Sequence, residues 1–246
     1  MDVKYYRDAS EFIKHAGEFL AVDEARYGLV LGIAKAVVVN PYQYAGQAPW
    51  FCSIGKENDI YAVAMRTPPY NLIVARFSGD PQVIAEKLML AVAAQFTTIP
   101  GVVGDKELGD AFADLWCEKH GVTIKDKTAQ RVYRLDKVNN VPVSPGRFRP
   151  ATMAEKNLVA RWHHAFNIDC FGPDKNVPET DVTPVIERGW VFFWEDGKPV
   201  SMALKTRPTD EGMTVSGVYT PPELRGKGYA TSCVAELSRN ILQSGK

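Results

Sequence analysis

The residues best suited to chemistry form a basic, glycine-rich turn near the end of the 246-residue chain. Residues 225–228 read Arg-Gly-Lys-Gly and stand between a β-branched run and a helix-like pattern. A helix N-terminus has unpaired N–H groups and a partial positive charge, and glycines let a ligand approach the backbone. Arg225 and Lys227 add cationic donors that suit phosphate oxygens. The turn therefore predicts a pyrophosphate site, although an ordinary helix-capping turn has the same composition.

Two familiar phosphate-binding motifs do not fit this stretch. A P-loop requires Gly-Lys followed by Ser or Thr, and here Lys227 is followed by Gly228. A dinucleotide-binding fold requires the first half of its glycine fingerprint inside a βαβ unit, whereas the strands predicted before this turn form a hairpin. The predicted anion site is therefore of another type.

The six residues 225–230, Arg-Gly-Lys-Gly-Tyr-Ala, are similar to the R/Q-x-x-G-x-G/A signature of the GNAT superfamily of acyl-CoA N-acyltransferases. Arg225, Gly228 and Ala230 fall on its three defined positions. The context is similar as well, because a capped helix, an antiparallel hairpin and a further strand precede the turn and a helix follows it. The resemblance covers residues 147–246.

This resemblance implies an N-acetyltransferase that moves an acetyl group from acetyl-CoA to a primary amine of a small molecule or peptide. It implies that backbone N–H groups of the turn hold the pyrophosphate and that the preceding strand pairs with the pantetheine arm. The acetyl carbonyl is then polarised by a backbone N–H near the end of that strand. The implied donor-binding residues are Val218, Tyr219, Thr220, Arg225, Gly226, Lys227, Gly228, Tyr229 and Ala230.

Amide formation needs a neutral amine, and deprotonating a lysine-like amine at neutral pH costs roughly 4–5 kcal/mol. The strand 215–220 carries no carboxylate, so no base lies directly on it. The catalytic candidates are Glu195, acting through water, and Tyr219. Alternatively, Glu195 is an exposed turn residue and Tyr219 a core aromatic. Glu223 is expected to face solvent or to pair with Arg225.

The loop 166–176 lies where GNAT proteins usually shape the acceptor site. Trp162, Phe166, Asp169 and Phe171 are therefore candidates for the acceptor pocket, with core packing as the alternative for the aromatic residues. His163 and His164 are adjacent on a helix and so face different directions, which leaves at most one of them for a cleft. Cys170 and Cys233 have no neighbouring base in the sequence and are expected to be inert.

Hydrophobic spacing and capping residues predict the elements of the first half. Helices are expected at 8–20, capped by Asp8 or Ser10, and at 22–36. Another is expected at 80–96, capped by Asp80, and one at 105–121. Strands are expected at 49–55, 59–67, 70–77 and 101–105, followed by a long strand or hairpin at 122–135.

The segment 137–150, rich in Asn, Pro and Gly, predicts a domain boundary between residues 1–140 and 147–246. Thr152 and Glu155 have the spacing of a capping box at the start of a helix over 152–169. A hairpin is expected at 190–206, a strand at 212–220 and a helix at 228–243. The predicted fold class is α/β of the α+β type, with a mixed, mainly antiparallel sheet flanked by helices. The order of elements in the first half predicts two tandem GNAT-like modules.

The composition predicts a cytoplasmic protein that binds neither nucleic acid nor a membrane. Lys plus Arg and Asp plus Glu both number 29, so any anion site must be local. The four cysteines are far apart, without metal-ligand spacing, so neither structural zinc nor a disulfide framework is expected. The N-terminus is too polar for a signal peptide. The expected partners are acetyl-CoA and an amine acceptor, and no metal.

A GNAT domain normally continues past this helix with another strand and helix, whereas the chain ends at Lys246. The expectation is that the chain is truncated, or that the missing elements come from a partner chain, as in a homodimer, or from the N-terminal half. This departure puts activity in doubt. A catalytically inactive acyl-CoA-binding or interaction module is therefore the alternative function.

Overall fold

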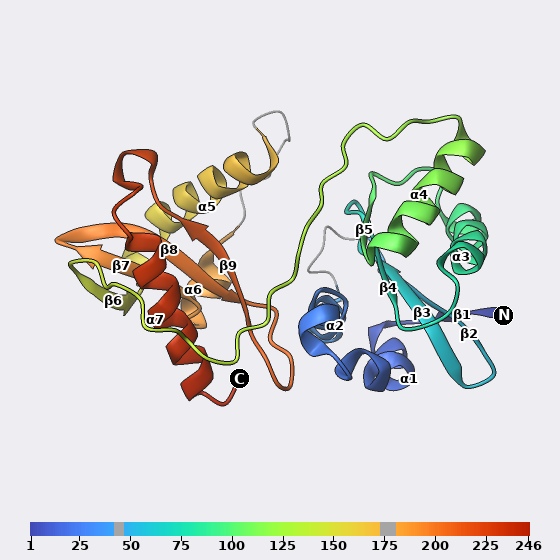
Figure 1. Ribbon diagram of the computed structural model, residues 1–246, viewed down its shortest axis with the longest axis horizontal. Helices are drawn as coiled ribbons and strands as arrows, with labels where there is room; N and C mark the ends of the chain where they lie inside the picture. Colours follow the sequence, from blue (N-terminus) through green and yellow to red (C-terminus); the bar gives the residue numbers. More distant parts are fainter. Residues whose placement is uncertain (42–46, 173–180) are drawn as a thin grey trace. The chain divides into compact units, whose positions relative to one another are not determined.

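The structure is a computed structural model that describes residues 1–41, 47–172 and 181–246, without the side chain of Phe171. It divides into two compact units, unit 1 from Met1 to Tyr133 and unit 2 from Arg134 to Lys246 (Figure 1). No helix in the described ranges is both long enough and apolar enough to cross a membrane.

Unit 1 is a five-stranded sheet with helices on both faces (Figure 1). The strand order is β1-β2-β3-β4-β5; the first four strands are antiparallel, and β5 is parallel to β4. Its elements are β1 (Asp2–Tyr6), α1 (Ala9–Ala21), α2 (Glu24–Val39), β2 (Trp50–Lys56), β3 (Asp59–Arg66), β4 (Leu72–Arg76), α3 (Pro81–Gln95), β5 (Val102–Gly104) and α4 (Lys106–His120).

The two faces of this sheet pack on different helices because neighbouring side chains of a strand point to opposite sides. Phe51 and Val63 face the core beneath α1 and α2, whereas Cys52 and Ala62 face the core beneath α3 and α4. Burial on both faces explains why the strands of unit 1 are nearly continuous apolar runs.

Unit 2 is a four-stranded antiparallel sheet in the order β6-β7-β8-β9. Phe193 and Tyr219 pack beneath α5 and α6, whereas Phe192 and Trp194 pack beneath α7. Its elements are β6 (Arg147–Pro150), the short 3-10 helix η1 (Met153–Glu155), α5 (Lys156–Phe171), α6 (Thr183–Glu187), β7 (Val191–Asp196), β8 (Lys198–Thr206), β9 (Thr214–Tyr219), the 3-10 helix η2 (Pro222–Leu224) and α7 (Tyr229–Gln243).

The predicted fold class is confirmed: mainly antiparallel sheets are flanked by helices, with one sheet in each unit. The two units also follow the same order of elements, which is one strand, two helices, three strands and a helix. Unit 1 then continues with β5 and α4, whereas α7 is the last element described in unit 2.

Helix caps agree with the sequence where the capping signal is local. Asp8 accepts a hydrogen bond from the N–H of Glu11, and Asp80 accepts from the N–H groups of Gln82 and Val83. In the predicted capping box, the carboxylate of Glu155 accepts bonds from the N–H and the hydroxyl of Thr152.

One predicted element is wrong and one was missed. Residues 122–135 form neither a strand nor a hairpin, and their side chains are exposed. Their alternating pattern satisfies only the local requirement for a strand, and nothing in the described part of the chain pairs with them to form a ladder. Conversely, β1 (Asp2–Tyr6) was missed because only Tyr6 of this edge strand is buried, so it lacks a strong apolar pattern.

Candidate functional site

The last strand of the unit 2 sheet, β9, is bent by a β-bulge. Tyr219 pairs with Met202 and Ser216 pairs with Leu204, so β9 advances by three residues between these two pairs while β8 advances by two. Gly217 lies inside this bulge with φ 58°, and a Cβ there would meet Leu204 Cδ1 at 2.8 Å. A bulge leaves backbone groups unpaired and bends the strand. The sequence VSGVYT therefore encodes a distorted strand close to the turn.

The turn after β9 leads into α7 through two glycines with left-handed backbone. Gly226 and Gly228 both have φ 78°, a conformation that glycine adopts without a Cβ penalty. Gly228 is the N-cap of α7, and no side chain of the described residues caps this helix. The N–H groups of its first turn thus remain available to an anion.

Hydrogen bonds to two distant segments hold the turn in place. Ser144 donates its hydroxyl to the carbonyl oxygen of Lys227 at 2.8 Å, and its N–H to Ser232 Oγ at 2.9 Å. The Tyr229 hydroxyl donates to Asp196 Oδ2 at 2.8 Å, which ties the first residue of α7 to the hairpin. Sequence reasoning missed Ser144 because it lies in the segment interpreted as a domain boundary. No local signal marks it.

A cavity of about 510 Å³ lies between this turn and the C-terminal end of α5. Every residue that the GNAT resemblance implies for donor binding lines it. The lining residues are Phe166, Asp169, Cys170, Val218, Tyr219, Thr220, Leu224, Arg225, Gly226, Lys227, Gly228, Tyr229, Ala230 and Thr231. The structure thus brings residues from α5, β9 and α7 together around one hollow.

Arg225 connects the two sides of this cavity. Its Nη2 lies 2.5 Å from Asp169 Oδ2, and its Nε donates to the carbonyl oxygen of Thr220 at 2.8 Å. The guanidinium also lies 5.8 Å from the centre of the Tyr219 ring. Arg225 therefore pairs with Asp169 and not with Glu223. Glu223 is exposed, which agrees with the first of its two expected positions, facing solvent.

The two catalytic candidates lie in different environments. Glu195 is bound by Arg147, at 2.6 Å and 2.9 Å, and by Arg149 at 2.5 Å, and it does not line the cavity. Hydrogen bonds from Arg147 and then Arg149 lower the pKa of Glu195. Tyr219 lines the cavity, and burial, followed by the nearby Asp169 charge, raises its pKa.

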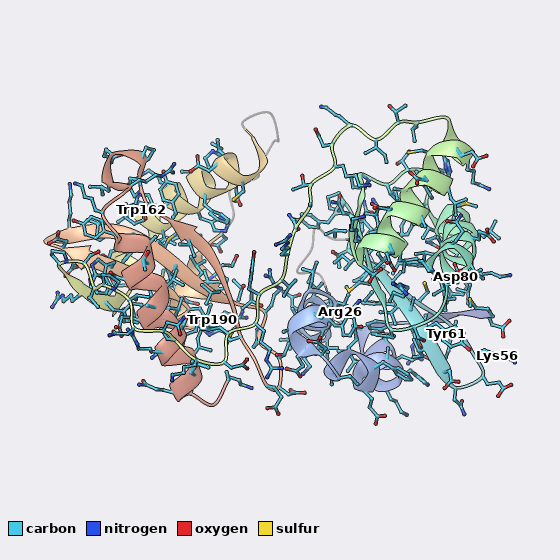
Figure 2. The ribbon with its side chains drawn as sticks, in the orientation of Figure 1. Arg26, Lys56, Tyr61, Asp80, Trp162 and Trp190 are labelled. Carbon is cyan, nitrogen blue, oxygen red and sulfur yellow. The ribbon has the colours of Figure 1, made fainter. Side chains whose placement is uncertain are left out.

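The candidates for the acceptor pocket separate into two groups. Phe166 and Asp169 line the cavity. Trp162 on α5 (Figure 2) instead packs edge-on against Phe193, with ring centres 5.6 Å apart, and belongs to the core. The side chain of Phe171 lies outside the described residues.

Among the remaining candidates, the two histidines do not line the cavity and the two thiols are not activated. Burial, followed by the charge of His164, lowers the pKa of His163, whose Nδ1 lies 3.3 Å from Asn167 Nδ2. Burial raises the pKa of Cys170, and it raises the pKa of Cys233 to about 12. Both thiols therefore stay protonated at neutral pH. Within the described ranges, no group of three or more His, Cys, Asp or Glu could hold a metal ion.

No protein-family model and no curated protein matches this sequence. A crystal structure of a Drosophila protein from a structural genomics consortium aligns with a TM-score of 0.61 at 14% identity, covering 98% of this chain and 86% of that one. This likeness shows a shared fold.

Two further solved structures carry a family name. A GNAT-family acetyltransferase from Colwellia psychrerythraea aligns with a TM-score of 0.47 at 14% identity, covering 100% of this chain and 87% of that one. A GCN5-related N-acetyltransferase from Kribbella flavida aligns with a TM-score of 0.40 at 19% identity, covering 75% and 73%. In unit 2 the strand, the glycine turn and the helix follow one another in the order that the sequence predicted.

Proposed function

We propose that unit 2 binds acetyl-CoA and transfers its acetyl group to a primary amine of a small molecule or peptide. One observation carries this proposal: the uncapped, glycine-framed N-terminus of α7 opens into the cavity beside Arg225 and Lys227. Backbone N–H groups and two cations suit a pyrophosphate better than a single carboxylate.

The backbone of β9 supports a role in holding the pantetheine arm. Among the described strands, β9 pairs with β8 alone, so its other edge is free to bond an extended ligand. Val218, Tyr219 and Thr220 at the end of this edge line the cavity. In this proposal the arm lies beside β9 while the pyrophosphate rests on the turn.

The bulge in β9 supplies the feature that acyl transfer needs at the carbonyl. Attack by an amine places negative charge on the thioester oxygen, and a backbone N–H already aimed at that oxygen stabilises it. In this proposal a backbone N–H of the bulge around Gly217, where pairing with β8 is interrupted, stabilises that oxygen.

Tyr219 is the best candidate for the final proton. The leaving CoA thiolate must gain a proton, and a tyrosine hydroxyl carries a proton at neutral pH that it can donate. Tyr219 lines the cavity, and it is the last residue of β9, the strand proposed to hold the donor. A Tyr219→Phe variant is expected to bind acetyl-CoA normally while losing turnover.

A catalytically inactive acyl-CoA-binding module is the second candidate, because the described cleft offers no free carboxylate. Glu195 is held by Arg147 and Arg149, and Asp169 is held by Arg225. A general base must be within reach of the amine and unoccupied. CoA binding without thiol release across a broad panel of amines would favour this candidate.

The test is a calorimetric titration of acetyl-CoA into the full chain. We expect micromolar binding that weakens at least tenfold in an Arg225→Ala, Lys227→Ala double variant, because a hydrogen bond from a charged group contributes about 1.5–3 kcal/mol. The matched control is Arg161→Ala, Lys198→Ala, which removes the same two residue types from exposed sites outside the cavity. Equal affinities for the two double variants would contradict the proposal.

A further inference from the structure

The strand β8 carries one polar residue that is completely buried. Ser201 is 0% exposed, and its neighbours along the strand, Val200, Met202 and Ala203, are buried apolar residues. Burying a polar group costs free energy unless the group is hydrogen-bonded, so a serine in such a run needs specific partners. Ser201 does not line the cavity, and any effect that it has on a ligand must therefore pass through another residue.

Ser201 is bonded to the end of β9 through two hydroxyl contacts. Its Oγ donates to the carbonyl oxygen of Tyr219 at 3.2 Å and accepts a hydrogen bond from Thr220 Oγ1 at 2.9 Å. The last ladder pair between β8 and β9 joins Met202 to Tyr219, so the hydroxyl contacts continue the attachment where the ladder ends. The carbonyl oxygen of Thr220 in turn accepts a bond from Arg225 Nε at 2.8 Å.

These contacts fix the direction of the peptide group between Tyr219 and Thr220. The C=O and the N–H of a trans peptide point in opposite directions. Because the Tyr219 carbonyl is directed at Ser201 on β8, the Thr220 N–H points away from β8, toward the edge of β9 that lines the cavity. No described residue accepts a bond from this N–H, whereas the hydroxyl and the carbonyl of Thr220 both have partners.

We propose that Ser201 is a positioning residue that aims the Thr220 N–H at an amide carbonyl of the donor's pantetheine arm. This inference rests on the proposed function of the same site. Thr220 lies between the bulge around Gly217, where the thioester is placed, and the turn that starts at Arg225, where the pyrophosphate is placed. The middle of the arm, which contains its amide groups, therefore passes Thr220, and an N–H on a strand edge bonds such a group as it would bond an added strand.

The hydroxyl pair matters because the ladder no longer holds the backbone at this point. Without Ser201, the peptide group after Tyr219 has to be ordered when the donor binds, and that ordering reduces the affinity. The Thr220 hydroxyl acts one step further away. Since Ser201 Oγ has a single hydrogen and accepts a bond from Thr220, its own hydrogen is left for the Tyr219 carbonyl.

The first experiment titrates CoA and ADP into wild type and Ser201→Ala. Both ligands carry adenosine and two linked phosphates, and only CoA carries the pantetheine arm. We expect Ser201→Ala to bind CoA about twofold to tenfold more weakly, as for one neutral hydrogen bond, and to bind ADP as wild type does. Equal losses for the two ligands would show a general disturbance of the fold, and no loss for CoA would show no role in binding; either result would overturn the positioning role.

Thr206→Val is the matched control for this titration. The Thr206 hydroxyl also lies on β8 and also donates to a carbonyl oxygen of β9, that of Thr214 at 3.5 Å, at the other end of the strand pair. Neither residue lines the cavity. Thr206→Val should bind CoA and ADP as wild type does, and a loss of CoA affinity equal to that of Ser201→Ala would overturn the assignment to Ser201.

The second experiment observes the N–H itself, by amide hydrogen exchange of Thr220 in nitrogen-15-labelled protein. We expect saturation with CoA to slow this exchange at least about tenfold in wild type, and saturation with ADP to slow it much less, because ADP has no arm. The protection by CoA should be smaller in Ser201→Ala. Exchange that CoA leaves unchanged, or that ADP slows as strongly, would overturn the proposed bond.

The Thr220 hydroxyl allows a third test without any substitution in the core. Thr220→Val removes the bond to Ser201 and keeps the backbone N–H, whereas Thr220→Ser keeps both. We expect Thr220→Val to weaken CoA binding about twofold and Thr220→Ser to recover most of that loss. In the Ser201→Ala background Thr220→Val should cost nothing further, because the hydroxyl acts through Ser201, and additive losses would overturn this coupling.

The two proposals fail in different ways. If CoA does not bind folded wild type, the proposed function itself is wrong. If CoA binds wild type and loses affinity in the Arg225→Ala, Lys227→Ala variant but not in Ser201→Ala, the donor site stands and only the positioning role of Ser201 is wrong.

Discussion

The helices α3 and α7 stand at equivalent positions in the two units, each the first α-helix after the third strand of an antiparallel set, and they begin in opposite ways. Asp80, labelled in Figure 2, caps α3. It accepts hydrogen bonds from the N–H groups of Gln82 and Val83 at 2.8 Å and 3.3 Å. Gly228 begins α7 and offers no side chain. One helix end is closed by the carboxylate of its own N-cap residue, and the other has no side-chain cap.

The strands before these helices show the same contrast. In unit 1, β4 is bonded on both sides, antiparallel to β3 and parallel to β5. In unit 2, β9 is bonded to β8, and the structure describes no strand on its other side. A saturated strand followed by a capped helix is a stable framework. An open edge followed by an open helix end has the two features that an extended, phosphate-bearing ligand requires.

The most direct way to break this contrast is to give α7 the cap that α3 has. A Gly228→Asp variant is expected to weaken acetyl-CoA binding about a hundredfold, because the carboxylate occupies the open N–H groups and repels phosphate. Gly228→Asn is the matched control, since asparagine tolerates left-handed backbone equally well and carries no charge. It should lose much less affinity by calorimetry.

The geometry of Gly228 makes that control necessary. Its φ is 78°, and a Cβ would meet Ser144 Oγ at 2.8 Å, so any side chain there introduces some strain. Both variants carry this strain, and only one carries the charge. Equal losses of affinity in the two variants would attribute the effect to backbone strain and would remove charge from the explanation.

The carboxylate of Glu155 holds the first helical turn of unit 2 through its hydrogen bonds to Thr152. Hydrogen bonds from Arg149 lower the pKa of Glu155 to about 2, although burial opposes the shift and bonds from Thr152 assist it. A pKa lowered from its usual 4.5 contributes stability above pH 4.5, and this stability is lost as the pH falls towards 2. The contribution is about 2 kcal/mol, allowing for solvent screening of the partly exposed pair.

We therefore expect Glu155→Gln to be about 2 kcal/mol less stable than wild type in urea at pH 6, with a difference that shrinks below pH 4.5. The matched control is Glu187→Gln, which removes an exposed acid at the end of α6 and should change stability little. A gap between wild type and Glu155→Gln that is as large at pH 2.5 as at pH 6 would contradict the assigned cause.

The cap of α3 should matter for stability and not for ligand binding. Asp80→Ala removes the acceptor of two backbone N–H groups, which is expected to cost about 1 kcal/mol of unfolding free energy. Asp80→Asn keeps an oxygen acceptor at the cap and should lose little. Neither variant should change the affinity for acetyl-CoA, and a change in Asp80→Ala alone would show that the helix ends of the two units are not functionally separate.

The features of the two helix ends that depend on neighbouring residues were predictable from the sequence. Asp80 is followed by Pro81 and a helical pattern, and the Arg-Gly-Lys-Gly turn is a run of consecutive residues. Capping and anion binding depend on residues within one turn of each other. The Asp80 cap and the start of a helix after the glycine turn are therefore both confirmed without knowledge of the fold, and anion binding at the turn stays a prediction.

The partners of the turn could not be predicted, because they come from distant segments. Arg225 meets Asp169 across 56 positions, Ser144 meets Lys227 across 83, and Glu195 meets Arg147 across 48. The prediction of a strand or hairpin at 122–135 was wrong for the same reason. Alternation of apolar and polar residues is a local property, whereas a strand also needs a neighbour to bond.

The smallest effect is expected from the distant residue that supports the turn, Ser144. Its hydroxyl donates to the carbonyl oxygen of Lys227, so it orients the peptide group directly before Gly228. Ser144→Ala removes this one bond and leaves the N–H of Ser144 on Ser232 Oγ. A single neutral hydrogen bond contributes about 0.5–1.5 kcal/mol, so acetyl-CoA affinity should fall about twofold to tenfold.

Ser244→Ala is the matched control, because its hydroxyl also donates to a backbone carbonyl, that of Ile241, at the far end of the same helix. The two variants should lose similar amounts of stability in urea, and only Ser144→Ala should bind acetyl-CoA less tightly by calorimetry.

The distinction matters for the comparison between the two helix ends. Asp80 bonds the first N–H groups of α3 through its own carboxylate, whereas Gly228 has no side chain to do so. If α7 must stay open for a ligand, its turn has to be ordered by a group outside the binding surface, and Ser144 is positioned to order it. Equal affinities for the two variants would show that the glycine turn keeps its shape without that support.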